Sequence, residues 1–385
     1  MTIWSWGANS YGQLANGNCE DQLLPCQVTN VPDNIQCIHG GGGHTLTIAG
    51  TGQLYSCGSN NKGQLGLNST EDVSVLTPVI VGNNDPVTMT TGGWDFSLAI
   101  SATSDLYSWG SNAFGQLGDV SLPNKCLTAV KLLLIFQTKI WEGEKFAQVA
   151  AGLRHVIALT VNGDVYCWGH SKKGQCAVIA VNDKLPLKTT SPNKVVFPAG
   201  TGKVVSVCVG SYHSVALTDK GQVYVWGCNK YGQCTQSPDV ILQVNTPYMV
   251  NQEMFKNQKV VEVKSGWTHL IAQTESGDLF SWGRTDYGQL GRSRSEGIMY
   301  SHIPGQIDIQ VTVSSFTCGS EHTLFLAENK VYALGWNEHG LCATGDEVNV
   351  KTVTKVSALE SQSVIYIACG GGHCFAISKE ELTRS

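Results

Sequence analysis

The chain has 385 residues, a formal net charge of −5, and only 14% charged residues beside 43 glycines. Glycine therefore stands at about 11%, above the usual level of about 7%, while charge falls below the usual ~25%. This composition excludes a disordered chain, a collagen and a coiled coil. It favours many short strands joined by tight turns.

The charge pattern argues against a nucleic-acid partner, because the pI is near 6.0 and the first twenty residues contain no Lys or Arg. The apolar runs, such as 132–136, are far shorter than a membrane span of ~20 residues, so we expect no membrane insertion. No secretory signal is visible, and the 14 cysteines contain no Cys-x-x-Cys pair. We expect a cytoplasmic protein without a cofactor, and the nucleus is a second candidate compartment.

One motif recurs along the chain: an aromatic strand that ends in Trp-Gly, followed by a turn with Gly-Gln-Leu, as in residues 4–14. The glycine that ends this strand marks seven copies: Gly7, Gly58, Gly110, Gly169, Gly227, Gly283 and Gly335. A second half of the repeat is Gly-x-x-His followed by a short apolar strand, at Gly41/His44, Gly152/His155, Gly210/His213, Gly266/His269, Gly319/His322 and Gly370/His373. In the remaining copy the same spacing places Asp95 after Gly92.

The period of about 55 residues and the alternating strands predict propeller blades, since a helical solenoid would need long segments of 3.6-residue period. We predict an all-β fold, a seven-bladed β-propeller that forms one domain over residues 1–378, with a short tail at 379–385. The chain starts on the second half of a hairpin at 4–7 and finishes on the first half at 370–377. Pairing of the N-terminal strand with the C-terminal strands is therefore predicted to close the ring.

Two segments depart from the repeat. The link between Gly118 and Gln148 is long and resembles an insertion, which leaves open a protrusion used in binding or an alternatively spliced stretch over 119–147. The fragment 200–204 lacks the remaining residues of a phosphate-binding loop. Cys369, His373 and Cys374 lie close together in sequence, but their spacing is not a known zinc pattern, so no metal site is expected.

These seven copies resemble the regulator of chromosome condensation (RCC1-like) repeat family. The resemblance covers nearly the whole chain and is strongest to secretion-regulating guanine nucleotide exchange factors, through segments such as 92–96, 150–155, 265–270, 282–290 and 335–340. It implies that the face carrying the Gly-x-x-His turns contacts a small GTPase of the Ras superfamily. No basic tail is present, so the chromatin binding of the founding member does not carry over.

Residues that break the repeat are the best candidates for partner contact, because a residue common to all copies serves the fold. The candidate partner-binding residues on the turn face are Trp94, Asp95, Arg154, His155, Tyr212, His213, Trp267, His269, Glu321 and His322. The histidines are expected to satisfy backbone groups at tight turns. Two alternatives stay open: the tryptophans pack between blades, and Arg154 and Glu321 pair with neighbouring turns. Arg284, Asp286, Glu338 and His339 are expected to form a second surface on the opposite face.

The sequence predicts an interaction propeller that regulates a small GTPase, with exchange-factor activity linked to secretion and an exocyst component as a further partner of a monomeric protein. Exchange needs no nucleophile, and no hydrolytic or redox site stands apart from the repeat. The alternative is a protein-interaction scaffold without exchange activity. A tryptophan-based ultraviolet-B sensor is disfavoured, because tryptophan occurs in only two non-adjacent Gly-x-x-His turns and without arginine beside it.

Overall fold

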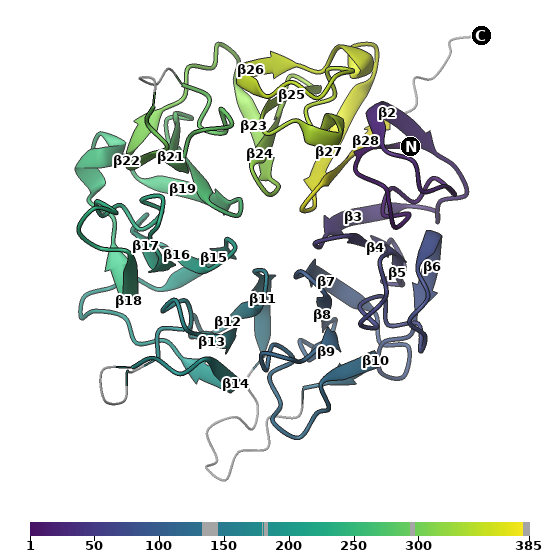
Figure 1. The fold of residues 1–385 in the computed structure, drawn as a ribbon, viewed down its shortest axis with the longest axis horizontal. Coiled ribbons are helices and arrows are strands. Elements are labelled where there is room, and N and C mark those ends of the chain that lie inside the picture. The colour runs from purple at the N-terminus through teal and green to yellow at the C-terminus, as the bar shows by residue number, and fades with distance from the viewer. Residues whose placement is uncertain (133–144, 179, 181–183, 293–296, 380–385) are drawn as a thin grey trace.

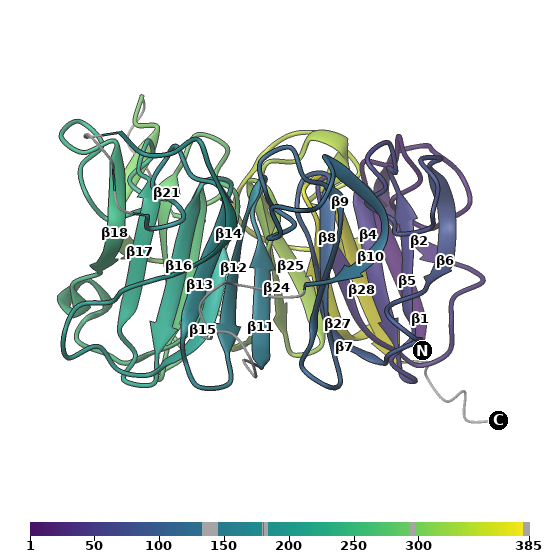
Figure 2. The same ribbon diagram turned by 90° about the horizontal axis from the view of Figure 1, so that it is seen from below.

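The computed structural model describes residues 1–132, 145–178, 180, 184–292 and 297–379. Its strands form seven four-stranded antiparallel sheets, arranged as blades around a central axis (Figure 1). Seen from the side, the strands run roughly along that axis, so the turns gather at the two faces of the ring (Figure 2). The predicted seven-bladed β-propeller is confirmed.

Six blades each come from one continuous stretch of chain, and their strands run outward from the axis in sequence order. These are β3(Ile35–Gly40), β4(His44–Ala49), β5(Leu54–Gly58) and β6(Val73–Val79); β7(Val87–Gly92), β8(Phe96–Ser101), β9(Leu106–Ser111) and β10(Lys125–Lys131); β11(Phe146–Ala151), β12(His155–Thr160), β13(Val165–His170) and β14(Lys188–Lys194); β15(Val204–Val209), β16(His213–Thr218), β17(Val223–Cys228) and β18(Gln243–Met249); β19(Val260–Ser265), β20(His269–Thr274), β21(Leu279–Arg284) and β22(Tyr300–Gln306); and β23(Val313–Cys318), β24(His322–Ala327), β25(Lys330–Gly335) and β26(Val350–Lys355). The described residues also form three short 3-10 helices: η1(Gln252–Phe255) and η3(Ser357–Leu359) link successive blades, and η2(Glu338–Gly340) lies between β25 and β26 of one blade.

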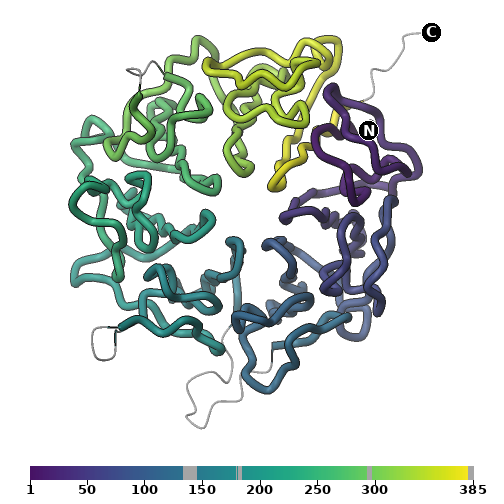
Figure 3. The backbone as a smooth tube through the Cα atoms, in the orientation of Figure 1, coloured from purple at the N-terminus to yellow at the C-terminus, as the bar shows by residue number. Residues whose placement is uncertain are grey.

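The seventh blade combines both ends of the chain. Its strands are β27(Ser363–Cys369), β28(His373–Lys379), β1(Thr2–Gly7) and β2(Gln22–Val28), in order from the axis outward. Strand β1 pairs antiparallel with β28, from Thr2 opposite Ser378 to Gly7 opposite His373. Figure 3 shows the purple and yellow ends of the tube meeting in this blade. The predicted closure of the ring by the N-terminal strand is confirmed.

The second strand of each blade is buried on both faces, because neighbouring blades cover it on either side. This explains why these strands carry apolar runs rather than a simple polar alternation. Five blades add a fully buried tryptophan on the third strand, whose indole Nε1 donates to a backbone carbonyl in a turn of the preceding blade. These residues are Trp6, Trp109, Trp168, Trp226 and Trp282. The repeated tryptophan thus fastens each of these blades to its neighbour.

The segment after Gly118 does not begin as an insertion. Residues Lys125–Lys131 form β10, which pairs with β9 as the outer strand of its blade. The predicted inserted stretch also includes residues 133–144, which lie outside the described residues. The long link therefore contains a normal blade strand followed by extra residues.

The glycine after each tryptophan position is required by backbone geometry. All seven marker glycines have φ between +95° and +109°, and the ladder to the fourth strand shifts register beside each of them. A Cβ at Gly283 would also collide with the carbonyl oxygen of Thr268 in the neighbouring turn. Glycine therefore permits both the left-handed bulge and the close approach of the two turns.

Gly283→Ala should destabilise the protein by at least about 3 kcal/mol, because strain of ~1–2 kcal/mol adds to a backbone collision. Gly277→Ala is the matched control: its φ is +90°, but a Cβ there would enter open space. It should cost only the backbone strain. Urea unfolding of the two variants measures the difference, and equal losses would show that the collision is relieved at no cost.

Candidate functional site

Both kinds of turn lie on the same face of the ring. Strand β4 begins at His44 and β5 ends at Gly58, and these residues pair across the two antiparallel strands. The Gly-Gln turn after β5 therefore returns to the face where the Gly-x-x-His turn lies. The prediction that Arg284, Asp286, Glu338 and His339 form a surface on the opposite face is wrong. In an antiparallel pair the first strand begins, and the second strand ends, at the same edge of the sheet, so the turns at these two points lie on one face.

The six repeated histidines are fully buried and join adjacent blades. Each Nε2 lies 2.8–3.2 Å from a side chain of the next blade: His44 and Ser97, His155 and Ser214, His213 and Ser265, His269 and Thr323, His322 and Cys374, and His373 and Thr45. The histidines therefore have a structural role, as expected. Each one contacts a side chain across the interface between two blades, called the seam below, rather than backbone groups of its own turn.

The seventh position of this ring is Phe96, not Asp95. A Cβ at Gly93 would meet the ring of Phe96, just as a Cβ at Gly152 would meet the ring of His155. The prediction that Asp95 takes the histidine position after Gly92 is wrong. Two glycines stand in a row, and the turn glycine is Gly93, so the histidine position falls one residue later. Phe96 packs in one apolar cluster with Val156 of the next blade, at the position where Ser97, Ser214 and Thr45 stand in other seams. An apolar pair thus replaces the hydrogen-bonded pair.

The seams hold neutral imidazoles. The Oγ1 of Thr45 donates to the carbonyl of Gln13 at 2.8 Å, so this hydroxyl accepts from Nε2–H of His373 at 2.9 Å. Burial lowers the pKa of His44 to about 4 and, more strongly than neighbouring histidines do, that of His373 to about 3. Burial likewise lowers the pKa values of His155, His213 and His269 to about 3.

Backbone hydrogen bonds also link the inner turns around the axis, across six of the seven seams between blades. The N–H of Gly42 donates to Gly93, and that of Trp94 to Leu153, which in turn donates to the following blade. The N–H of Gly371, in the blade that closes the ring, donates to Gly41 in the blade of β3 to β6. The inner ends of all seven blades therefore hold one another in a fixed arrangement around a small cavity lined mainly by glycines.

Trp94 and Trp267 meet over this cavity from blades on opposite sides of the ring, with ring centroids 5.8 Å apart. A Cβ at Gly42 would meet the ring of Trp94, and one at Gly371 would contact the ring of Trp267. The glycine turns of 41–43 and 370–372 thus make room for the two indoles. Trp94 is 45% exposed and Trp267 is half-buried, so the pair presents an apolar surface at the mouth of the cavity.

Arg154 lies in a second, half-buried group on this face. Its guanidinium stands 4.6 Å from the ring centre of Phe114, which contacts the ring of His170 edge-on. His170 in turn lies 5.5 Å from the ring of Tyr212. The carboxyl of Asp95, one blade away, has its pKa raised by burial, and the charge of Arg154 opposes this shift. A cation, aromatic rings and a carboxyl group therefore lie on the turn face of three neighbouring blades.

Glu321 is buried rather than exposed. Thr268 Oγ1 donates to its Oε1 at 2.5 Å, and Gln289 Nε2 donates to its Oε2 at 2.8 Å. Arg284 stands 3.8 Å away, and burial raises the pKa of Glu321 to about 7. This geometry agrees with the alternative that the sequence left open, in which Glu321 pairs with neighbouring turns.

Arg284 is the exposed end of this network. It forms an ion pair with Asp286 at 2.6 Å and stacks on the rings of Tyr231 and Tyr287, at 4.9 and 4.4 Å from their centres. Sequence reasoning missed Phe114, Tyr231 and Tyr287. A signal was present, because the residue before the turn glycine is aromatic in several copies, including Tyr11.

The structure divides the ten predicted site residues into two groups. Trp94, Asp95, Arg154, Tyr212 and Trp267 are exposed or half-buried on one face. His155, His213, His269, His322 and Glu321 are buried beneath it. The first group can contact a partner directly, whereas the second positions the turns that carry it. Among the described residues, no helix is long and apolar enough to cross a membrane.

Comparisons with known proteins agree with this architecture. Residues 2–376 match the family described as the RCC1-like domain. The mouse secretion-regulating guanine nucleotide exchange factor is 38% identical over 97% of this chain and 83% of its own length. The Arabidopsis thaliana ultraviolet-B receptor UVR8 is 33% identical over 77% of this chain and 63% of its own. The crystal structure of Prp20p from Saccharomyces cerevisiae, reported with its binding to Gsp1p and histones, has a TM-score of 0.85 at 23% identity and covers 99% of this chain and 92% of its own.

Proposed function

The chain belongs to the RCC1-like domain family, and on that premise we propose that its turn face binds a small GTPase and accelerates guanine nucleotide release. The finer part of the proposal is that this activity serves secretion, in the cytoplasm and with a secretory partner such as an exocyst component. It is supported by the name and the extensive similarity of the mouse relative.

The observation that carries the proposal is that adjacent residues of one turn differ in burial. The histidine of the repeat, or Phe96 in its place, is buried in a seam, whereas the residue before it differs between blades and is half-buried in three of them, as Asp95, Arg154 and Tyr212. Aromatic and arginine side chains are enriched at binding hot spots. A rigid ring that displays Trp94, Trp267 and Arg154 on one face suits recognition of a single shaped protein surface.

Such a face promotes exchange by differential affinity alone. A protein that binds the nucleotide-free GTPase more tightly than the loaded form shifts the population toward release. The energy comes from contacts made only after nucleotide and Mg²⁺ leave, and no chemical step at the propeller is involved. The fixed ring of hydrogen-bonded turns supports this mechanism, because a preorganised surface loses little entropy on binding.

Replacing Trp94 and Trp267 together by alanine should reduce the acceleration of nucleotide release at least about tenfold, since each is a central aromatic anchor. Stopped-flow release of fluorescent GDP from a panel of Ras-superfamily GTPases measures the rate. Val161→Ala is the control, because Val161 is 49% exposed at the opposite face, after β12 ends.

Three outcomes separate the alternatives. Equal rates for the double variant and the native chain would remove the turn face from the mechanism. Stable binding of a nucleotide-free GTPase without faster release would favour the scaffold function. Restoration of secretion in depleted cells by the native chain, but not by the double variant, would support the secretory role.

A further inference from the structure

One inter-blade seam differs chemically from the others. At the seam after β24, His322 faces Cys374, the position occupied by Ser97, Ser214 or Thr45 elsewhere. One hydroxyl of the ring, that of Ser265, comes instead from the position just before the turn glycine, and Cys369 occupies that position here. Both oxygen positions available to His322 have therefore been replaced by thiols.

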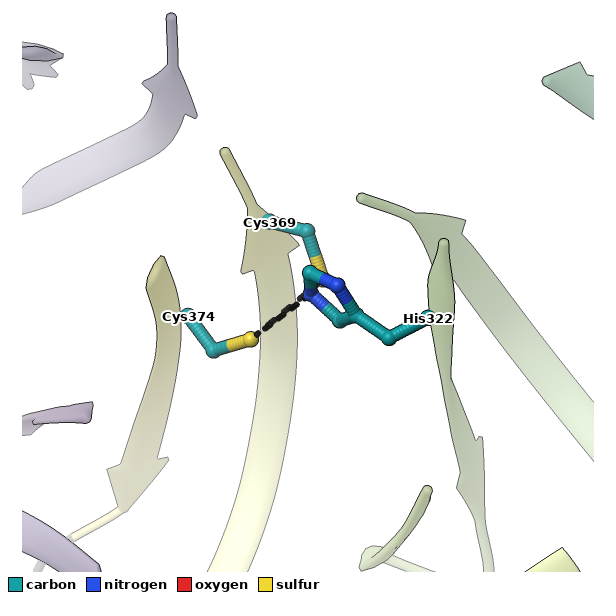
Figure 4. A group of neighbouring side chains, drawn as sticks. All are labelled: His322, Cys369 and Cys374. Atoms are coloured by element: carbon teal, nitrogen blue, oxygen red, sulfur yellow. Dashed lines mark hydrogen bonds between the residues drawn. The ribbon is translucent and has the colours of Figure 1, made fainter. Parts of the chain in front are cut away.

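Figure 4 shows the three side chains converging from neighbouring strands. The Nε2 of His322 lies 3.1 Å from Sγ of Cys374, and the two sulfur atoms lie 3.7 Å apart. All three potential ligand atoms fall within 4.8 Å of one another. Two thiolates bound to tetrahedral zinc at ~2.3 Å stand roughly 3.8 Å apart, so this spacing is close to that of an occupied site.

The backbone holds the two cysteines in this arrangement. Cys369 and Cys374 stand directly opposite each other in the β27–β28 hairpin, and Gly370 N–H donates to the carbonyl of His373 in the turn between them. Cys374 and His322 are fully buried, whereas Cys369 is half-buried and lines the central cavity. An ion has a route to the ligands from that cavity, and the ligands lose little freedom on binding it.

We propose that His322, Cys369 and Cys374 form a binding site for one thiophilic d¹⁰ cation, Zn²⁺ or Cu⁺. Two thiolates and an imidazole are the donor set these ions prefer over Mg²⁺ or Ca²⁺. Both cysteines bind such an ion as thiolates, and the imidazole coordinates it through the Nε2 lone pair. The site joins β24 to the blade that contains both chain ends, so an ion here would reinforce the closure of the ring.

The test uses the full, reduced chain with Zn²⁺ and, under anaerobic conditions, Cu⁺, each in competition with a chromophoric chelator. We expect one equivalent of one of these ions to bind, with release of protons and a thiolate charge-transfer band when Co²⁺ replaces Zn²⁺. Cys369→Ser and Cys374→Ser should each weaken binding by at least about 100-fold, because losing a ligand exceeds the effect of losing an outer-shell partner.

The serine variants are chosen because they restore the hydroxyls of Ser265 and Ser214 in equivalent seams, so they should fold. Cys19→Ser removes an exposed thiol outside the cluster and should bind as the native chain does. Thermal unfolding confirms the integrity of each variant. Native binding no tighter than that of the double serine variant, or formation of a disulfide between the two cysteines without any bound ion, would overturn the proposal.

Discussion

A chain that begins at Ala8 should lose at least about 5 kcal/mol of stability and unfold without a single cooperative transition. Strand β1 supplies the third strand of the closing blade, and its removal leaves β28 and β2 without a shared partner. It also removes Trp6, whose Nε1 donates to the carbonyl of Leu341 at 3.0 Å. Loss of a buried tryptophan alone costs ~3–5 kcal/mol, which approaches the total stability of many domains.

Urea unfolding followed by tryptophan fluorescence and circular dichroism measures this effect. Adding a peptide of residues 1–8 in trans should restore part of the lost stability, because the vacated position in the blade remains. Comparing Trp6→Ala with Trp282→Ala separates the contribution of ring closure from that of tryptophan packing. Trp282 makes the equivalent hydrogen bond between two blades that do not contain the chain ends. An unchanged urea midpoint after the deletion would show that β1 is dispensable for closure.

Acidification from pH 7 to pH 5 should lower the free energy of unfolding by several kcal/mol. Five seam histidines have folded pKa values of about 3 or 4, below the unfolded value of ~6.5. The unfolded chain therefore binds more protons, and stability is lost as pH falls from about 6.5 toward 3. Each histidine contributes up to about 1.4 kcal/mol per pH unit. The pKa of Glu321 is raised to about 7, so protonation of this one group stabilises the folded chain as pH falls and offsets part of the loss.

The chain contains its own control for this prediction. His155→Phe combined with Ser214→Val reproduces the apolar seam of Phe96 and Val156, so the double variant should fold. It should lose the pH-dependent contribution of one histidine. Urea unfolding at several pH values measures the slope, and an identical slope for the variant and the native chain would contradict the assignment.

The sequence was sufficient for the propeller, its blade number and its closure, because a motif repeated seven times encodes one unit of structure each time. It was insufficient where the partner of a residue comes from another blade. His373 follows Cys369 closely in sequence, yet it contacts Thr45 across the seam, while Cys374 faces His322 from the preceding blade. Trp94 and Trp267 are far apart in sequence and meet only because the ring closes.

The position of β1 within the last blade also has a consequence for biosynthesis. When β1 leaves the ribosome, its partner β28 has not yet been made, since Thr2 pairs with Ser378. The open edge of β1 and β2 must remain free of other strands until β28 has been synthesised, and such edges are prone to aggregate. Closure of the ring thus requires a pairing of high sequence separation between β1 and β28, a kind of contact that forms slowly.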